Sequence, residues 1–316
     1  MSAPKEIPRP PHPRKRREPL PVQIPKPLEE DPESRRRLEA ILESPSYREA
    51  DEDVDFLRHG ETRGLRLQLD YLKAERLLER HGVRHAVVVF GGTRIREPAA
   101  ALRQAQALRT AAAANPADAA LAARLRVSER LLEKSRYYDV AREFGRLVGE
   151  SNKNFPDSRW FVMTGGGPGI MEAANRGAWV AGAETIGLNI RLPHEQFPNP
   201  YVTPELCFRF HYFAMRKLHF LLRARALIAF PGGFGTFDEL FETLTLVQTR
   251  TMTPVPVVLV GESYWRRAVD FDFIAEEGLI DVEDKELFWF AETAAEIWDG
   301  IRRWHAMNEE RSEGKP

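Results

Sequence analysis

The sequence has only one cysteine, Cys207, among 316 residues. A single thiol cannot form an intramolecular disulfide, and without a CxxC companion it lacks the spacing of a zinc-binding pair. We interpret Cys207 as a buried thiol and expect the chain to fold in a reducing, cytoplasmic compartment. The cysteine content therefore excludes a disulfide scaffold and predicts no metal site.

The sequence also lacks long apolar runs and an excess of charge of one sign. No stretch approaches the roughly 20 apolar residues that span a bilayer, and the charged, proline-rich N-terminus has no apolar segment of the signal-peptide kind. The formal net charge of −1 gives no long-range attraction to nucleic acid or to an anionic membrane. We therefore expect a small-molecule partner, no membrane association, and no nucleic-acid function.

The first 50 residues alternate proline with charge and lack apolar residues at the spacing that packing requires. We predict a mostly disordered arm over residues 1–50. Its basic run at residues 14–17 is interpreted as solvated charge, with contact to nucleic acid or phospholipid as the alternative. Residues 51–310 are predicted to form one domain and residues 311–316 a tail.

Strands alternate with helices along the predicted domain. Short apolar runs predict strands at residues 85–90, 160–164, 184–190, 226–230 and 255–261. Helical spacing predicts an extra N-terminal helical region at residues 32–42 and 64–81, a helical insertion of two or three helices at about residues 97–150, and helices ending near residues 181, 223 and 248. This order predicts an α/β fold: a Rossmann-like, doubly wound, mostly parallel sheet with helices on both faces.

Glycine-rich loops follow three of the predicted strands, at residues 91–93, 165–169 and 232–236. Glycine lets the backbone approach a phosphate closely, and the next helix adds free N–H groups. Any one of these loops could be only a tight turn, but three at the same edge of a sheet favour an anionic ligand. None matches the P-loop or the GxGxxG of dinucleotide sites, so we expect no NAD and no other cofactor.

The third loop lies in the stretch PGGFGTFDEL, residues 231–240, where two carboxylates follow the glycines. One interpretation is a capping box, with Thr236 as helix N-cap and Glu239 as the third helical residue. The other is catalytic, because a ribose 5-phosphate losing its base develops positive charge at C1′ that a carboxylate stabilises. Asp238 and Glu239 point about 100° apart on a helix, so only one of them can face such a ligand.

A cation for the phosphate or the departing base is available in FHYFAMRKLHF, residues 210–220. This predicted helix carries Arg216 and Lys217. The planar guanidinium of Arg216 suits bidentate binding of phosphate. The alternative is a solvated or salt-bridged residue on a helix surface.

Three motifs together, TGGGPGIMEAANRGA, MRK and PGGFGTFDEL, resemble those of the LOG (lonely guy) family of nucleoside 5′-monophosphate phosphoribohydrolases. The resemblance spans roughly residues 54–307. It implies a Rossmann-like fold, a homodimer or higher homo-oligomer, and a hydrolase that needs no cofactor. The implied reaction hydrolyses the N-glycosidic bond of AMP or N6-substituted AMP, the cytokinin nucleotides, to free base and ribose 5-phosphate.

The resemblance assigns roles position by position. Arg216 matches the family's catalytic arginine and Glu239 its catalytic glutamate, 23 positions further on. The other matched positions are implied to bind the substrate: Gly232, Gly233, Gly235 and Thr236 in the phosphate loop, Gly165, Gly166 and Gly167 in the second loop, and Lys217 beside the arginine.

Two further residues are candidates from their positions. Thr93, at the end of the first strand, could hydrogen-bond the nucleotide. Glu172, one turn into the helix after GGGPG, either reaches a ribose hydroxyl or complements the helix dipole. Plant-type members of the family usually read MxxRK and PGGxGTxEE, whereas this chain has Phe213 and Asp238 at two of those positions. With its long arm and insertion, the sequence resembles the larger bacterial branch, and AMP-like nucleotides are the expected substrates.

A function of another class is a non-catalytic nucleotide-binding sensor or carrier protein with the same fold. The presence of both Arg216 and Glu239 favours the enzyme, since a pure binder gains little from a carboxylate beside an anion. Many members of the family were labelled lysine decarboxylases, but nothing in this sequence marks a lysine for pyridoxal phosphate.

Overall fold

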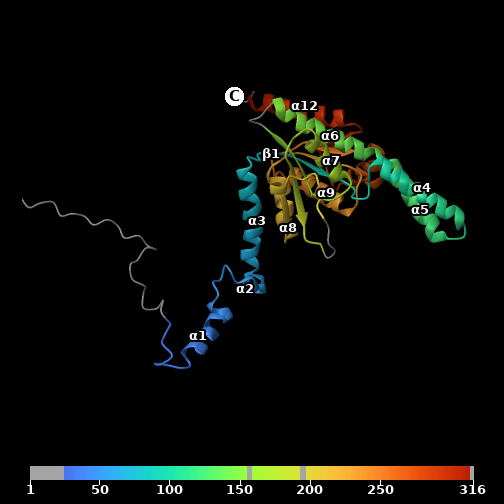
Figure 1. Cartoon of the computed structure of the whole chain (residues 1–316). Helices are drawn as coiled ribbons and strands as arrows, with labels where there is room; N and C mark the ends of the chain where they lie inside the picture. The colour runs from blue at the N-terminus through green and yellow to red at the C-terminus, as the bar shows by residue number, and fades with distance from the viewer. Residues whose placement is uncertain (1–24, 155–158, 193–196, 314–316) are drawn as a thin grey trace, which may run out of the picture. The chain divides into compact units, whose positions relative to one another are not determined.

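The computed structural model describes residues 25–154, 159–192 and 197–313 (Figure 1). The predicted disorder of the first 24 residues, and the basic run within them, lie outside the described residues. The chain divides into two compact units, with the boundary between Arg66 and Leu67. No described helix is long and apolar enough to cross a membrane.

The first unit contains short helices without a buried core. They are α1 (Ser34–Leu42), η2 (Pro45–Tyr47), α2 (Val54–Arg58) and η3 (Gly60–Thr62), and no residue of these elements is buried. The Asp53 side chain caps α2 by accepting hydrogen bonds from the backbone N–H groups of Asp55 and Phe56. Packing contributes little to these helices, so a local cap of this kind is a main stabilising contact of α2.

The second unit is built on a seven-stranded parallel sheet with the order β4-β3-β2-β1-β5-β6-β7. Its strands are β1 (His85–Phe90), β2 (Trp160–Thr164), β3 (Thr185–Ile190), β4 (Cys207–Phe210), β5 (Ala224–Ala229), β6 (Val257–Val260) and β7 (Phe288–Ala291). The chain adds strands outward from β1 to β4 and then returns to place β5 on the other side of β1. The switch point of the sheet therefore lies between β1 and β5, where open α/β folds bind their ligands. The predicted doubly wound parallel sheet is confirmed.

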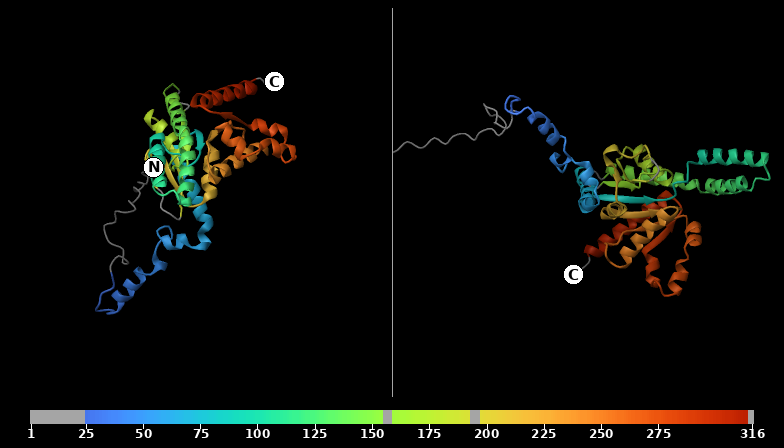
Figure 2. Two further views of the ribbon diagram at one scale, coloured as in Figure 1. Left: turned by 90° about the vertical axis from the view of Figure 1, so that its right-hand side faces the viewer. Right: turned by 90° about the horizontal axis from the view of Figure 1, so that it is seen from below.

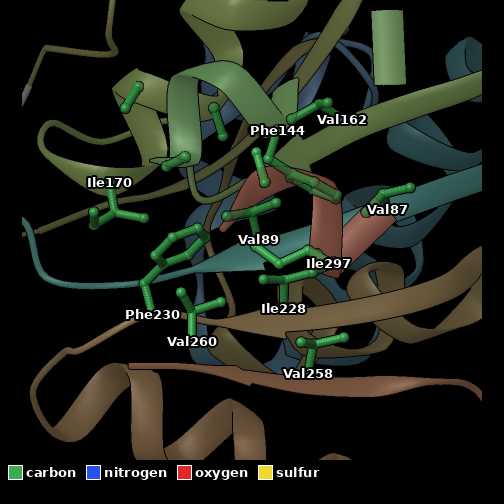
Figure 3. Packing of buried hydrophobic residues seen from close by; sticks show 14 of the residues in the cluster. Val87, Val89, Phe144, Val162, Ile170, Ile228, Phe230, Val258, Val260 and Ile297 are labelled. Atoms are coloured by element: carbon green, nitrogen blue, oxygen red, sulfur yellow. The ribbon is translucent and has the colours of Figure 1, made fainter. Parts of the chain in front are cut away.

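Helices cover both faces of the sheet, because alternate residues of each central strand point to opposite sides. Val87 and Val89 of β1 pack in one apolar cluster with Phe144 of α6 and Ile297 of α12 (Figure 3). The opposite cluster packs against helices α3, α8, α9 and α10. The helices of this unit are α3 (Arg63–Arg80, which begins before the unit boundary), α4 (Pro98–Ala114), α5 (Ala119–Lys134), α6 (Arg136–Asn154), α7 (Ile170–Val180), α8 (Phe213–Leu222), α9 (Phe234–Gln248), α10 (Glu262–Ala268), α11 (Phe271–Glu276) and α12 (Ala294–Glu313).

The helical insertion consists of three helices, of which two leave the sheet. Helices α4 and α5 form a hairpin that projects from the body of the unit, whereas α6 lies on the sheet (Figures 1 and 2). Only Ala101 and Ala105 of α4 and Ser128 of α5 are buried. The outer half of the hairpin therefore contributes nothing to the core.

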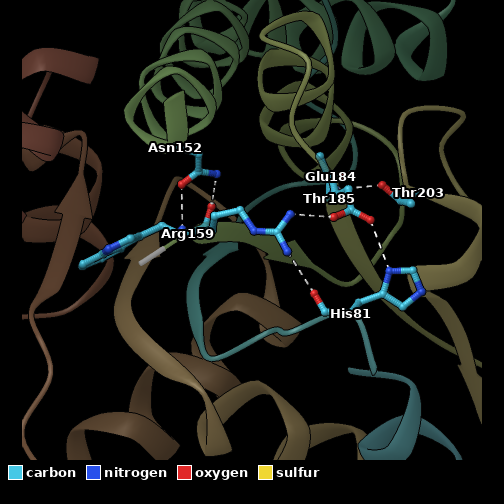
Figure 4. Close-up of polar contacts among 7 residues, drawn as sticks. His81, Asn152, Arg159, Glu184, Thr185 and Thr203 are labelled. Carbon is cyan, nitrogen blue, oxygen red and sulfur yellow. Dashed lines mark hydrogen bonds and ion pairs between the residues drawn. The ribbon is translucent and has the colours of Figure 1, made fainter. Parts of the chain in front are cut away.

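Polar contacts fix the amino ends of β2 and β3, at the edge of the sheet opposite the glycine loops (Figure 4). The Arg159 guanidinium donates to Glu184 Oε2 at 3.1 Å and to the His81 carbonyl at 3.1 Å. The Asn152 side chain donates to the Trp160 carbonyl and accepts from the Trp160 N–H. These contacts join the starts of β2 and β3 to α6 and to the end of α3, on the side of the sheet away from the glycine loops.

Candidate active site

The three predicted glycine loops meet at the carboxyl edge of the sheet, as expected. Gly92, after β1, donates its N–H to the Pro231 carbonyl after β5 at 2.9 Å. The Gly92 carbonyl in turn accepts from the N–H of Ile170, the first residue of α7, at 3.4 Å. The first loop therefore holds the other two together at the switch point of the sheet.

Gly169 can only be glycine in this arrangement. Its φ is +74°, and a Cβ atom there would lie 2.4 Å from the Gly92 carbonyl oxygen. The left-handed backbone lets the chain turn into α7 while the second loop contacts the first. Gly165 is half-buried, and Gly166 and Gly167 are buried in the same loop.

A buried network of polar side chains supports the GGGPG loop. The Thr164 hydroxyl donates to Asn175 Oδ1 at 2.7 Å and accepts from the Gly166 N–H at 2.9 Å. Asn199 donates its N–H to the Gly166 carbonyl at 2.8 Å, and its side-chain amide donates to the Gly167 carbonyl at 3.1 Å. Because these groups satisfy one another away from water, the loop is held in one conformation.

The predicted capping box at the third loop is wrong. Helix α9 begins at Phe234 with Gly233 as its N-cap, and no side chain caps this end. Thr236 is instead a buried helical residue whose hydroxyl lies against Gly232, where a Cβ atom would come within 2.1 Å of it. The glycines allow the helix to start three residues earlier than threonine capping would. The first N–H groups of α9 are thereby left without a side-chain acceptor, as in anion-binding helix termini.

Glu239 and Arg216 lie together in the interior beside this loop. Their side chains are only 4% and 14% exposed, and Arg216 Nη2 lies 3.6 Å from Glu239 Oε1. This distance gives an ion pair but no hydrogen bond. Both Glu239 Oε1 and Arg216 Nε are buried without a hydrogen-bond partner among the described residues. Buried charges are normally hydrogen-bonded, so the pair retains bonding capacity for a ligand.

Burial shifts the protonation of both groups. Removal from water, only partly offset by the charges of Lys217 and Arg216, raises the pKa of Glu239 to about 7. Removal from water likewise lowers the pKa of Arg216, against the attraction of Glu239 and Asp238. A carboxyl group with a pKa near neutrality can exchange a proton at physiological pH, as a general acid or base requires.

Lys217 is held away from this pair by two other carboxylates. Its ammonium group donates to Asp238 Oδ1 at 2.8 Å and to Glu242 Oε2 at 2.9 Å. Burial opposes the charge, but these two hydrogen bonds outweigh it and the pKa of Lys217 is raised. Asp238 is half-exposed while its neighbour Glu239 is buried, as expected for adjacent helical residues.

Helix α8, which carries Arg216, is anchored at both ends by α3. The Asp70 carboxylate accepts from the backbone N–H groups of His211 and Tyr212 at 2.9–3.2 Å, and so caps a helix whose own N-cap residue provides no side-chain cap. At the other end Glu75 accepts two hydrogen bonds from the Arg223 guanidinium at 2.6 and 2.8 Å. The motifs did not predict these residues, because α3 is about 140 positions earlier in the chain.

An aromatic ring completes the surroundings of Arg216. The guanidinium carbon lies 4.1 Å from the centroid of the Phe213 ring, one turn earlier in α8. This stacking uses the face of the guanidinium and leaves its edge N–H groups for an anion. Phe213, which replaces the family's methionine, thus contributes to the orientation of the arginine.

The two remaining candidates, Thr93 and Glu172, differ in their surroundings. Thr93 is exposed on the first loop. Glu172, in the first turn of α7, accepts a hydrogen bond from the Tyr138 hydroxyl of α6 at 2.9 Å. Burial raises the pKa of Tyr138 to about 12, so its hydroxyl remains a donor to Glu172. Glu172 therefore has a structural partner in addition to its position at the helix end.

The fold and the site define a class of protein: a Rossmann-like α/β protein with a buried arginine–glutamate pair among three glycine loops. A family model described as "Possible lysine decarboxylase" matches residues 171–301. The chain is 28% identical over 181 residues to cytokinin riboside 5′-monophosphate phosphoribohydrolase LOG3 of Arabidopsis thaliana, covering 56% of this chain and 80% of that protein. It is 28% identical over 167 residues to cytokinin riboside 5′-monophosphate phosphoribohydrolase LOG of Oryza sativa subsp. japonica, covering 52% and 65%. The chain is therefore similar to enzymes of the LOG family, and the resemblance predicted from its motifs is confirmed.

A solved structure of the Moco carrier protein from Chlamydomonas reinhardtii aligns with 71% of this chain and 99% of its own. Its TM-score is 0.43 and its sequence identity 19%. A likeness at this level carries no argument about function.

Proposed function

We propose that the protein hydrolyses the N-glycosidic bond of a nucleoside 5′-monophosphate, AMP or an N6-substituted AMP such as cytokinin riboside 5′-monophosphate. The products are the free base and ribose 5-phosphate. The observation that carries the proposal is the buried pair of Glu239 and Arg216, each with an unpartnered polar atom, beside the uncapped start of α9. The relatives named as phosphoribohydrolases support it.

In this proposal the 5′-phosphate binds at the third loop. Gly232, Gly233 and Gly235 expose the backbone at the start of α9, and its first N–H groups donate to the phosphate oxygens. Helix α9 has 15 residues, long enough for its dipole to favour an anion at this end. The second loop, with Gly165, lies across the switch point and bounds the ribose.

Glu239 acts on the reacting carbon. As the bond from C1′ to the base nitrogen breaks, its electron pair leaves with the base and the ribose ring becomes oxocarbenium-like. The Glu239 carboxylate stabilises this positive charge. A water oxygen then bonds to C1′ and loses a proton that Glu239, with a pKa near 7, can accept, while the departing base gains one.

Arg216 completes the charge balance of the site. Its guanidinium lies next to Glu239, and its buried Nε has hydrogen-bonding capacity left for a phosphate or a leaving base. In the free protein the charges of Lys217 and Arg216 oppose the effect of burial and lower the pKa of Glu239.

Lys217 has the wrong chemistry for a decarboxylase lysine. A Schiff base requires a neutral amine, which burial in apolar surroundings or a nearby cation would favour. The two carboxylates beside Lys217 instead favour its ammonium form. We propose that Lys217 orders the start of α9 through Asp238 and Glu242, and so supports substrate binding indirectly.

A pair of matched variants tests the role of Glu239. Glu239→Gln keeps the size of the side chain but removes its charge, so we expect AMP turnover to fall by at least about a hundredfold with AMP binding retained. Asp238→Asn makes the same change at the exposed neighbouring position, and its AMP turnover should fall much less. Base release is measured by chromatography and binding by calorimetry. Equal activity of Glu239→Gln and the wild type would refute the assigned role.

We further propose that the protein is cytoplasmic and forms a homodimer or a higher homo-oligomer. Large apolar side chains are exposed on the second unit, with Trp179 57% and Val180 62% exposed at the end of α7. Such side chains are more often covered in an assembly than left in water. Sedimentation of the purified chain measures the oligomeric state, and a monomer at micromolar concentration would contradict this part of the proposal.

A further inference from the structure

A cavity outside the candidate active site lies next to the phosphate loop, because Tyr264 of its lining contacts the Gly232 carbonyl. It has a volume of about 600 Å³ and is formed where the end of α5 and the start of α6 approach α10. Its lining includes four cationic side chains, Arg130, Lys134, Arg136 and Arg267, and a single carboxylate, Glu133. None of these residues belongs to the motifs that predicted the active site.

Three of the four cations of this cavity have no ion-pair partner among the residues that the structure describes. Arg136 forms an ion pair with Glu292 at 3.0 Å. In the described part of the chain, Arg130, Lys134 and Arg267 take part in no ion pair. Like charges gathered around one cavity repel one another, and an anion inside it would relieve that repulsion.

Neutral hydrogen-bond donors line the same cavity. The Tyr137 hydroxyl accepts a hydrogen bond from Arg136 and keeps its own proton to donate, because burial raises its pKa. Ser263 adds a second hydroxyl.

We propose that this cavity binds the polyphosphate group of a nucleotide-sized ligand, a nucleoside di- or triphosphate. Three unpaired cations on two separate helices match a chain of phosphates better than a single phosphate, which could contact only one side. The volume falls within the range of small-molecule sites and exceeds what inorganic phosphate would fill. The site is distinct from that of the proposed hydrolysis, and its existence does not depend on that reaction.

The cavity is linked to the phosphate loop by one side chain. Tyr264 lines the cavity, and its hydroxyl donates to the Gly232 carbonyl at 2.5 Å. A ligand that moves Tyr264 therefore moves the backbone that we propose to hold the substrate phosphate. Occupancy of the cavity is expected to change the affinity of the protein for AMP.

The binding test uses the full chain, calorimetry and three probes: ATP, ADP and inorganic pyrophosphate. The background is Arg216→Ala, which weakens the active site, so that binding reports on the cavity. A double variant, Lys134→Ala with Arg267→Ala, should weaken ADP binding by at least about tenfold. The matched control removes two cations from the same helices outside the cavity, Arg126→Ala with Arg266→Ala, and should bind as before.

Each outcome decides the proposal. Tighter binding of ADP than of pyrophosphate assigns a nucleotide, and equal binding assigns a free polyphosphate; both support an anion site. No binding of any probe, equal binding by the two double variants, or displacement of ADP by sulfate at matched ionic strength would overturn it.

The link to the active site has its own readout. In the Glu239→Gln protein, saturating ADP should change the dissociation constant for AMP, and adding the Lys134→Ala and Arg267→Ala changes should abolish that effect. If ADP merely competes for the active site, the effect will persist when the cavity cations are removed. That result would overturn the link.

Discussion

Glu239 combines two properties that a stable core avoids, a charge and an unpartnered buried oxygen. Natural proteins keep such groups where function requires them, at the expense of stability. Arg216, beside Glu239, likewise carries a charge and has a buried nitrogen, Nε, without a hydrogen-bond partner among the described residues. These two residues therefore lower the stability of the free protein, and a substrate that bonds to their unpartnered atoms would restore part of it.

The raised pKa of Glu239 predicts a pH-dependent stability difference. In the unfolded chain the carboxyl ionises near 4.5, whereas in the folded protein it holds its proton up to about pH 7. The folded state of the wild type therefore loses stability as pH rises from about 4.5 to 7, relative to a neutral side chain. We expect Glu239→Gln to match the wild type near pH 4 and to exceed it by on the order of 3 kcal/mol above pH 7.

Denaturant unfolding at a series of pH values measures this difference. Asp238→Asn is the control, because that carboxylate is half-exposed and should show no comparable trend. A stability difference for Glu239→Gln that stays constant from pH 4 to pH 8 would be inconsistent with a raised pKa.

Motif and structure agree on some residues and differ on others. The family resemblance assigned Arg216 and Glu239 to one site, and the structure places their side chains 3.6 Å apart. The capping box at Thr236 was wrong, because a glycine N-cap also starts a helix and the sequence pattern fits both. The roles of Asn175 and Asn199 were missed, since only the folded chain brings Asn175 to the Thr164 hydroxyl and Asn199 to the backbone of the GGGPG loop.

At the scale of elements, the sequence predicts the central strands of the sheet but not the outermost strands, β4 and β7. The bounds of β1 and β2 match the prediction, because continuous apolar runs buried on both faces leave little ambiguity. The edge strands β4 and β7 have four residues each and were not predicted. Short edge strands depend on pairing with a neighbour, and pairing cannot be read from local periodicity.

Helix α8 depends on a cap from another helix, which gives an element-scale prediction. Asp70→Ala leaves the N–H groups of His211 and Tyr212 without their acceptor, so the second unit should lose about 1 kcal/mol of stability. The start of α8 should also shift, and because Arg216 lies in its first turns, AMP turnover should fall more than AMP binding.

Glu79→Ala is the matched control for this variant. Glu79 is an exposed acidic residue on the same helix, α3, and its replacement should change neither the stability of the second unit nor AMP turnover. Asp70→Asn retains an acceptor oxygen and should recover part of the activity. If Asp70→Ala lowers stability without affecting turnover, Asp70 has no positioning role.

For the whole molecule, the projecting hairpin is separable from the sheet that carries the site. Its outer half has no buried residue, so replacing residues 107–125 by a short glycine–serine turn should leave the core intact. We expect the melting temperature of the second unit to change by no more than about 4 °C, since little free energy is involved. Calorimetry checks this, and loss of a cooperative transition would show that the hairpin stabilises the fold.

The arrangement of the whole chain explains why one edge of the sheet carries the chemistry. Parallel strands bring the loops after β1, β2 and β5 to the same edge, and hydrogen bonds through Gly92 join them. At the other side of the sheet, where the strands begin, Arg159 and Glu184 are joined by a hydrogen bond. The phosphate binding and bond cleavage that we propose thus fall in one place, although the glycine loops are separated by up to about 140 positions.

Base release from AMP and from adenosine, compared by chromatography of the same enzyme preparation, tests the central claim most directly. Adenosine lacks the 5′-phosphate that we assign to the α9 loop. The account predicts free adenine from AMP, none from adenosine, and none from AMP with Glu239→Gln. GMP, CMP and N6-isopentenyl AMP, run in parallel, rank the bases. Equal release from AMP and adenosine, or no release from any nucleotide that the protein binds, would contradict a phosphoribohydrolase, and the second result would favour a nucleotide-binding sensor or carrier.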